Sequence, residues 1–159
     1  MENVEIYTDG GCLGNPGPGG YGAILAFETD CIELSGGYRQ TTNNRMEMMA
    51  CIAALEELDN QCIVTVYSDS KYLVDSVSKG WVMAWRQNNW RRSNGSRAEN
   101  VDLWERLLAL IQKHRVRFVW VKGHHGHPEN ERCDQLATAA AYGSNLLEDV
   151  VYTARDVML

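Results

Sequence analysis

The sequence lacks paired cysteines, long apolar runs and internal repeats, and each absence excludes a class of protein. Its five cysteines are an odd number, widely spaced and without a Cys-x-x-Cys pair, so we expect neither a disulfide framework nor a cysteine-rich zinc site. No apolar run approaches the ~20 residues that cross a bilayer, and the start Met1-Glu2-Asn3 has neither the basic end nor the apolar core of a signal peptide. We therefore expect a cytoplasmic protein with reduced thiols and no membrane partner.

What is present is the composition of one folded domain. Hydrophobic residues make up 45% of the 159 residues and charged residues 23%, a mixture typical of soluble globular proteins. A chain of this length can bury a substantial core as one unit. No linker-like or low-complexity stretch divides it. We expect a single domain over residues 1–159, with no obligate protein partner and nothing that demands more than a monomer.

The charge of the chain is acidic overall but unevenly distributed. The net charge is −6, whereas proteins that bind nucleic-acid duplexes usually present a basic face. Between Asp75 and Glu99 there is no acidic residue. That interval instead carries five basic residues interleaved with three tryptophans: Lys79, Arg86, Arg91, Arg92 and Arg97, with Trp81, Trp85 and Trp90. We expect Trp85 to pack inward, and the arginines indicate a surface that contacts phosphates.

The pattern of apolar residues predicts a mixed α/β domain. Alternation and turn residues predict strands over 4–8, 21–27, 31–35, 63–67 and 116–121, with a glycine- and proline-rich loop over 10–20. Helical periodicity predicts helices over 43–58, 71–78, around 104–111 and over 128–142, the first capped by Thr42 and the last beginning at Pro128. Because helical crossovers lead to the later strands, we expect those strands to run parallel to the first.

Two segments echo each other in a way that indicates shared chemistry. Ile6-Tyr7-Thr8-Asp9-Gly10 and Val66-Tyr67-Ser68-Asp69-Ser70 are each an apolar strand that ends in a hydroxyl residue, an aspartate and a small residue. If the two strands are parallel neighbours about 4.8 Å apart, Asp9 and Asp69 lie at the same sheet edge and could share one or two cations. The alternative is that each aspartate only starts a turn or caps a helix.

Glu47 and Asp134 are acidic residues at positions where predicted helices should face the sheet. The helical neighbours of Glu47 are all apolar: Ala50, Cys51, Ala54 and Leu58. A carboxylate in line with that stripe should face the core, where an unpaired charge is costly. Asp134 lies beside small residues, Ala137, Thr138 and Ala141, which would let its helix approach the sheet. The alternatives are a first-turn glutamate favoured by the helix dipole and an exposed aspartate.

These four carboxylates and a histidine-rich segment define the expected chemistry. Four oxygen ligands without paired soft ligands favour Mg²⁺, or Mn²⁺, over zinc. Up to two such ions around a phosphodiester would activate water and stabilise the leaving oxygen. His124, His125 and His127 precede the last helix but lack a fourth soft ligand for a zinc site. One loop histidine that transfers protons near the metals is the favoured interpretation.

Seven motifs stand in a fixed order along the chain. They are Tyr7-Thr8-Asp9-Gly10, Gly14-Asn15-Pro16-Gly17, Thr41-Thr42-Asn43-Asn44-Arg45-Met46-Glu47, Ser68-Asp69-Ser70, Asn100-Val101-Asp102-Leu103-Trp104, Trp120-Val121-Lys122-Gly123-His124 and Gly126-His127-Pro128-Glu129-Asn130-Glu131-Arg132-Cys133-Asp134. Together they resemble the bacterial type 1 ribonuclease H family, ribonuclease HI, and are far more specific than any one motif. The resemblance covers about residues 3–142 and leaves 143–159 as a C-terminal tail that does not align clearly.

The resemblance implies a five-stranded mixed sheet flanked by helices. It also implies an enzyme that cuts the RNA strand of RNA–DNA hybrids and leaves 5′-phosphate and 3′-hydroxyl ends. By the same resemblance the metal ligands are Asp9, Glu47, Asp69 and Asp134, and His124 acts in proton transfer or product release. The matched substrate contacts are Cys12, Asn15, Asn43 and Asn44 for the minor groove and backbone, Thr42 for a DNA-strand phosphate, and Trp81 with Arg86, Arg91 and Arg92 for the DNA strand.

The chain departs from the family at three places. Lys71 stands where relatives often carry glutamine, so a different substrate contact is expected there. The basic segment 91–97 relies on arginine rather than lysine, and His125 replaces a small residue. The arginine-rich segment indicates a different affinity for the hybrid, no effect is predicted for His125, and the four acidic positions are intact.

Other functions are compatible with clustered carboxylates. A junction resolvase or integrase-like core would use such a cluster but lacks the runs 42–47 and 126–132. A hybrid-binding module without catalysis is a rival of another class. Retention of four acids argues against it, because binding a polyanion gains nothing from clustered negative charge. A glycosidase with a carboxylate pair is a more distant alternative.

Overall fold

A mixed sheet of five strands organises the chain. The computed structural model describes the backbone of residues 1–123 and 127–158 and the side chains of residues 1–123 and 127–154. The strands are β1 (Glu2–Cys12), β2 (Gly17–Ala26), β3 (Cys31–Thr41), β4 (Cys62–Ser68) and β5 (Arg115–Trp120). Their order in the sheet is β3-β2-β1-β4-β5, so β1 lies at the centre.

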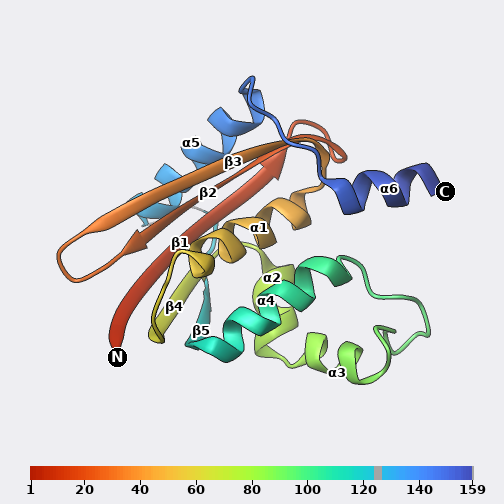
Figure 1. Cartoon of the computed structure of the whole chain (residues 1–159), viewed down its shortest axis with the longest axis horizontal. Helices are drawn as coiled ribbons and strands as arrows, with labels where there is room; N and C mark the ends of the chain where they lie inside the picture. Colours follow the sequence, from red (N-terminus) through yellow and green to blue (C-terminus); the bar gives the residue numbers. More distant parts are fainter. Residues whose placement is uncertain (124–126, 159) are drawn as a thin grey trace.

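Helices cover both faces of this sheet. They are α1 (Asn43–Glu56), α2 (Lys71–Ser78), α3 (Trp81–Gln87), α4 (Val101–Lys113), α5 (Pro128–Tyr142) and α6 (Val150–Met158). Figure 1 shows α1 and α4 in front of the sheet, α5 behind it, and α3 with its following loop extending away from the strands. Within 1–123 and 127–158, none of the helices is long and apolar enough to cross a membrane.

The directions of the strands follow from their connections. β2 pairs antiparallel with β1 and β3 with β2, because short turns join them. β4 pairs parallel with β1 after α1, and β5 pairs parallel with β4 after α2, α3 and α4, as a helical crossover requires. The expected α/β class, the five-stranded mixed sheet and the parallel later strands are confirmed.

The main core lies between the sheet and the helices α1, α2 and α4. Its largest fully buried side chains are Val4, Ile6, Leu25, Val64 and Val66 from the strands and Met46, Met48, Ile52, Leu55, Leu73, Trp104 and Leu107 from the helices. Trp85 packs against this cluster, with its ring centroid 6.3 Å from that of Trp104. The inward orientation expected for Trp85 is confirmed, and it anchors α3 to the domain.

The ends of α1 and α5 lie where local sequence places them. The Thr42 hydroxyl accepts a hydrogen bond from the Arg45 N–H at 3.2 Å, which caps α1 as expected. Pro128 is at the start of α5 and Gly143 follows its last residue, the common arrangement of proline and glycine around a helix. Both helices are therefore fixed at the end that carries the candidate acidic residues.

Glycines on β2 let α5 pack directly on the strand. A Cβ at Gly20 would lie 2.2 Å from the Ala137 carbonyl oxygen, and one at Gly22 would lie 2.4 Å from that of Cys133. A larger residue at either position would push the helix away from the sheet. These two positions determine how closely α5, and with it Asp134, approaches the central strands.

The loop expected over residues 10–20 is shorter than the sequence indicates. β1 continues to Cys12 and β2 begins at Gly17, with Cys12 paired to Gly19 and a register irregularity between Gly17 and Gly19. The expectation was wrong because glycine-rich strands show no alternation of side chains. The glycines serve close packing rather than a wide loop.

The tail after α5 returns to the edge of the sheet. The Arg39 N–H donates to the Leu147 carbonyl at 2.8 Å, and the Leu147 N–H donates to the Gly37 carbonyl at 2.9 Å. Leu147 thereby adds a short parallel bridge to β3. The bridge places Asp149 against the start of α1, where its side chain is buried.

Candidate active site

The ends of β1 and β4 bring two aspartates to one edge of the sheet. The parallel register pairs Tyr7 with Tyr67 and ends there, and Asp9 and Asp69 each follow two residues later. Asp9 is buried and Asp69 half-buried. The echo between the two segments therefore marks parallel neighbours. Their carboxyl ends form the kind of edge at which open α/β sheets bind ligands.

Glu47 reaches the same edge from α1. Gly10, directly after Asp9, allows this approach: a Cβ there would lie 2.4 Å from the carbonyl carbon of Met46 and 2.6 Å from the Glu47 nitrogen. Only 9% of the Glu47 surface is exposed. The side chain faces inward, as its apolar helical neighbours predict.

The three carboxylates form one compact group. One oxygen from each of Asp9, Glu47 and Asp69 lies within 4.8 Å of the others. The pKa of Glu47 is raised well above 4.5, first because burial removes water from the carboxyl group and then because Asp9 and Asp69 repel a third charge. Its Oε2 is buried without a hydrogen-bond partner in the described part of the chain. Oxygen donors at this spacing could hold a hard divalent cation, which would relieve the repulsion.

Asp134 is exposed and lies across a cavity from Gly10, the residue after Asp9. It stands on the second turn of α5 and lines a cavity of about 190 Å³ together with Gly10, Gly11 and Ala137. The close approach of α5 that its small neighbours predict is observed, although the carboxylate is not among the three whose oxygens lie within 4.8 Å. Its role as a fourth ligand stays a prediction. His124 lies outside the described residues.

The expected minor-groove residues surround the start of α1. The Cys12 N–H donates to Asn43 Oδ1 at 2.8 Å, and the Asn43 N–H donates to Asn15 Oδ1 at 3.1 Å. These bonds tie the turn after β1 to the first turn of α1, where Thr42 and Asn44 also lie. All five residues are at least partly exposed. They form one partly exposed polar surface at the start of the helix that carries Glu47.

Lys71 and Trp120 form a cation–π pair beside Asp69. The Lys71 Nζ atom lies 5.0 Å from the centroid of the Trp120 ring. Trp120, at the end of β5, donates its Nε1 hydrogen to the Asp69 carbonyl at 3.2 Å. Sequence reasoning did not single out Trp120 as a site residue. Its ring holds an exposed positive charge close to the carboxylate edge.

The tryptophan- and arginine-rich segment forms a separate, exposed surface. Trp81 begins α3 with 44% of its surface exposed, and the Lys79 Nζ atom lies 5.2 Å from its ring centroid. Arg86, on α3, and Arg91 and Arg92, in the following loop, are exposed as well. The side chains of Arg91 and Arg92 each donate a hydrogen bond within that loop. Hydrogen bonds within the loop therefore restrain the two exposed arginine side chains.

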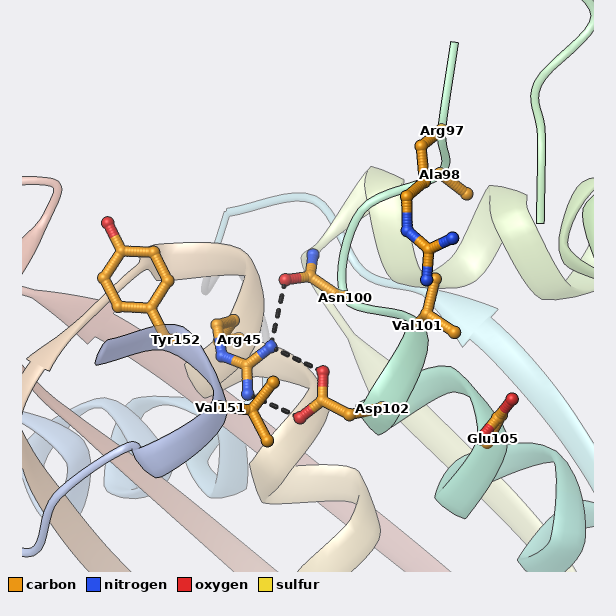
Figure 2. Close-up of a pocket in the computed structure, with 9 residues that line it drawn as sticks. All are labelled: Arg45, Arg97, Ala98, Asn100, Val101, Asp102, Glu105, Val151 and Tyr152. Carbon is orange, nitrogen blue, oxygen red and sulfur yellow. Dashed lines mark hydrogen bonds and ion pairs between the residues drawn. The ribbon is translucent and has the colours of Figure 1, made fainter. Parts of the chain in front are cut away.

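An ion-pair network at the start of α1 was not anticipated. The buried guanidinium of Arg45 donates to both oxygens of Asp102 at 2.7 and 2.9 Å and to both oxygens of Asp149 at 2.6 and 2.8 Å. Figure 2 shows the Arg45 guanidinium facing Asn100 and Asp102, with Val151 of α6 lining the same pocket. Burial alone would raise the pKa of Asp102, but the bonds to Arg45 outweigh it and lower that pKa. No local spacing indicates such distant partners.

Both the sequence and the fold match known proteins. The RNase H family model matches residues 1–142. A Ribonuclease H of Rippkaea orientalis is 55% identical over 156 residues, which cover 98% of this chain and 96% of the relative. The crystal structure of LC9-RNase H1, a type 1 RNase H with the type 2 active-site motif, matches with a TM-score of 0.79 and 33% identity over 98% of this chain and 81% of that one. The crystal structure of LC11-RNase H1 in complex with an RNA/DNA hybrid matches with a TM-score of 0.64 and 26% identity. That match covers 87% of this chain and 96% of the other.

Replacing Glu47 by glutamine should stabilise the metal-free protein above neutral pH. A carboxyl group whose pKa is raised on folding stabilises the native state below its ordinary pKa of 4.5, and this contribution is lost as the pH rises through the raised pKa. In chelator at pH about 8, we expect Glu47→Gln to melt about 2–4 °C above the parent, the shift that ~1 kcal/mol produces in a domain of about 150 residues.

Thermal unfolding monitored by circular dichroism checks this expectation. The difference in melting temperature between Glu47→Gln and the parent should narrow towards pH about 4. The matched control is Glu57→Gln, which neutralises an exposed glutamate at the other end of α1 and should leave the melting temperature unchanged. If Glu47→Gln melts at or below the parent temperature at the higher pH, burial and repulsion do not make ionised Glu47 costly to the fold.

Proposed function

The chain belongs to the ribonuclease H family, whose members hydrolyse the RNA strand of RNA–DNA hybrids, and we propose that it does so with divalent cations held by carboxylates. The observation that carries the proposal is the group of Asp9, Glu47 and Asp69, with one oxygen of each within 4.8 Å of the others. A surface that only bound nucleic acid would be weakened by three clustered negative charges. A cation site accounts for them.

The donor set fits Mg²⁺, with Mn²⁺ as a substitute. In the described part of the chain, neither a histidine nor a cysteine joins the carboxylate group, and all-oxygen donors favour these hard cations over zinc. The buried Glu47 Oε2 lacks a hydrogen-bond partner among the described residues, as suits a ligand atom. We propose up to two ions, with Asp134 as the fourth ligand. When bound, they supply Lewis acidity toward the phosphate and a more acidic water.

The residues of the chain orient the reacting groups and move protons. The Gly10 N–H donates to Asp9 Oδ1 at 2.9 Å, which holds that carboxylate in place. We assign His124 to proton transfer or product release, because the pKa of an ordinary histidine lies near neutrality. The water loses a proton as its oxygen joins the phosphorus, the bond from phosphorus to the 3′-oxygen breaks, and the 3′-oxygen takes up a proton. The products then carry 5′-phosphate and 3′-hydroxyl ends.

Recognition of the RNA strand uses the polar surface around the start of α1. The grooves of an A-form-like hybrid expose the RNA 2′-hydroxyl groups, and side-chain amides can both donate to and accept from them. The proposed groove and backbone contacts are Cys12, Asn15, Asn43 and Asn44. Hydrogen bonds join the first three of these residues. RNA duplexes should be poor substrates. The strand that is not cut must deform to reach its phosphate contacts, and the flexible sugars of DNA allow this.

Recognition of the DNA strand uses positive charge and a helix N-terminus. Thr42 caps α1, and the N–H groups at such a position favour a phosphate. Trp81, Arg86, Arg91 and Arg92 extend this contact along exposed α3 and its loop. Lys71, held over the Trp120 ring beside Asp69, adds a phosphate contact nearer the cut. These contacts are independent of base sequence.

We propose that the enzyme acts as a monomer in the cytoplasm, without an obligate protein partner. The proposed acids and substrate contacts all belong to this one chain, so no second subunit is needed to complete the site. RNA–DNA hybrids arise where DNA is replicated and transcribed, which in bacteria is the cytoplasm.

Cleavage of an end-labelled RNA–DNA hybrid with Mg²⁺ or with chelator tests the proposed function. We expect cleavage only with the metal. Asp69→Asn should lower the rate at least about a hundredfold, because it removes one charge of the ligand group. The matched control, Asp59→Asn, changes an exposed aspartate beyond the end of α1 and should cut at the parent rate. Full activity of Asp69→Asn, or cleavage in chelator, would contradict the proposal, and equal cleavage of an RNA duplex would contradict hybrid specificity.

Reversing two charges in the loop after α3 should weaken hybrid binding. For Arg91→Glu with Arg92→Glu, we expect the slope of log affinity against log salt to fall by about 1–2, since each phosphate contact contributes about 0.9 on B-form DNA. Single-turnover cleavage at saturating enzyme should not change. Fluorescence anisotropy at several salt concentrations measures the slope. The control, Arg115→Glu with Arg117→Glu, reverses equal charge on exposed positions of β5; an equal effect of both pairs would remove the loop from the interface.

A further inference from the structure

Asn130 lies where β1 and β4 separate, next to the carboxylate edge. The parallel ladder between the two strands ends at Tyr7 and Tyr67. There the Nδ2 amino group of Asn130, the third residue of α5, donates to the carbonyl oxygens of Thr8 and Tyr67, both at 3.4 Å. Asn130 is 2% exposed. One buried amide thus joins the two strands beyond the last pair of their ladder.

The two carbonyls that Asn130 joins belong to the segments that carry the aspartates. Thr8 directly precedes Asp9, and Tyr67 precedes Asp69 by two residues. One amino group can reach both acceptors only while the two strand ends keep a single separation. The amide therefore restrains the distance between the backbone positions from which Asp9 and Asp69 project.

The asparagine at this position both gives and costs stability. Its Oδ1 is buried without a hydrogen-bond partner in the described part of the chain. An apolar side chain of similar size would avoid that unsatisfied oxygen, but it would also remove the donor to the Thr8 and Tyr67 carbonyls. One turn later on α5, the Cys133 thiol donates to the Tyr7 carbonyl at 3.2 Å and so contacts β1 alone. Of these two side chains, Asn130 is the one that joins both strands.

We propose that Asn130 is a positioning residue, which sets the separation of Asp9 and Asp69 and thereby the affinity of the site for a divalent cation. It acts through the backbone of β1 and β4. The proposal rests on the metal site of the proposed function. It gives α5 two tasks in the site, because the same helix carries Asp134.

A calorimetric titration of the protein with Mn²⁺, without hybrid, tests this role. Asn130→Leu keeps the size of the side chain and removes both N–H donors. Its dissociation constant for Mn²⁺ should rise about tenfold or more, the usual effect of losing a group that orients metal ligands. The matched control is Cys133→Ala, which removes a donor from α5 to β1 only and should bind Mn²⁺ within about twofold of the parent.

Cleavage assays separate positioning from a general loss of structure. For Asn130→Leu, the Mg²⁺ concentration at half-maximal rate should rise by a similar factor, while KM for the hybrid at saturating Mg²⁺ stays unchanged. A residue that only stabilised the fold would lower the melting temperature without moving the Mg²⁺ dependence. If Asn130→Leu gives no cooperative melting transition, Asn130→Ser carries the same test, because one hydroxyl cannot donate to both carbonyls at once.

The outcomes distinguish the positioning role from the proposed function. If the parent binds Mn²⁺ and Asn130→Leu, or Asn130→Ser in its place, binds within about twofold of it, the positioning role is overturned and the metal site stands. If the parent binds no Mn²⁺ and cuts the hybrid in chelator, the metal site is overturned and the positioning role with it. A tenfold loss confined to the Asn130 variants supports both.

Discussion

Repulsion among Asp9, Glu47 and Asp69 is the constraint around which the rest of the structure is arranged. Burial and the charges of Asp9 and Asp69, each with an oxygen within 4.8 Å, together raise the pKa of Glu47. Exposed on flexible segments, the three side chains would move apart. They stay together because two come from adjacent strands of the sheet and one from a helix packed on its core. A divalent cation bound by the three carboxylates would offset the repulsion among them.

The surrounding structure holds the carboxylates in place through three separate elements. Gly10 removes the side chain that would separate α1 from β1. Arg45 ties the start of α1 to Asp102 on α4 and to Asp149 in the tail, with its guanidinium almost fully buried. Asn130 joins the ends of β1 and β4 from the opposite face. The partners of Arg45 lie outside the carboxylate group, whereas Gly10 and Asn130 fix the backbone directly beside it.

What could be predicted from the sequence was local in character. The strand alternation, the cap at Thr42 and the helix start at Pro128 depend on neighbouring residues, and the structure has them as expected. The extent of the glycine-rich strands over 10–20 was missed, because glycines show no alternation and their role becomes visible only against α5. The ion pair of Arg45 with Asp149 joins residues 104 positions apart, which no spacing rule reveals. The same holds for the candidate site. The two similar segments that end in Asp9 and Asp69 could be found in the sequence, whereas the contacts of Arg45 and Asn130 could not.

Anomalous X-ray scattering from a crystal containing Mn²⁺ tests most directly whether the three carboxylates hold a cation. We expect an anomalous peak that marks a Mn²⁺ ion about 2.1–2.2 Å from oxygens of Asp9, Glu47 and Asp69. This distance is close to that of Mg²⁺–oxygen bonds. The peak should vanish when chelator replaces the metal. A map without a peak among these carboxylates at saturating Mn²⁺, or with its peak at another site, would contradict the account.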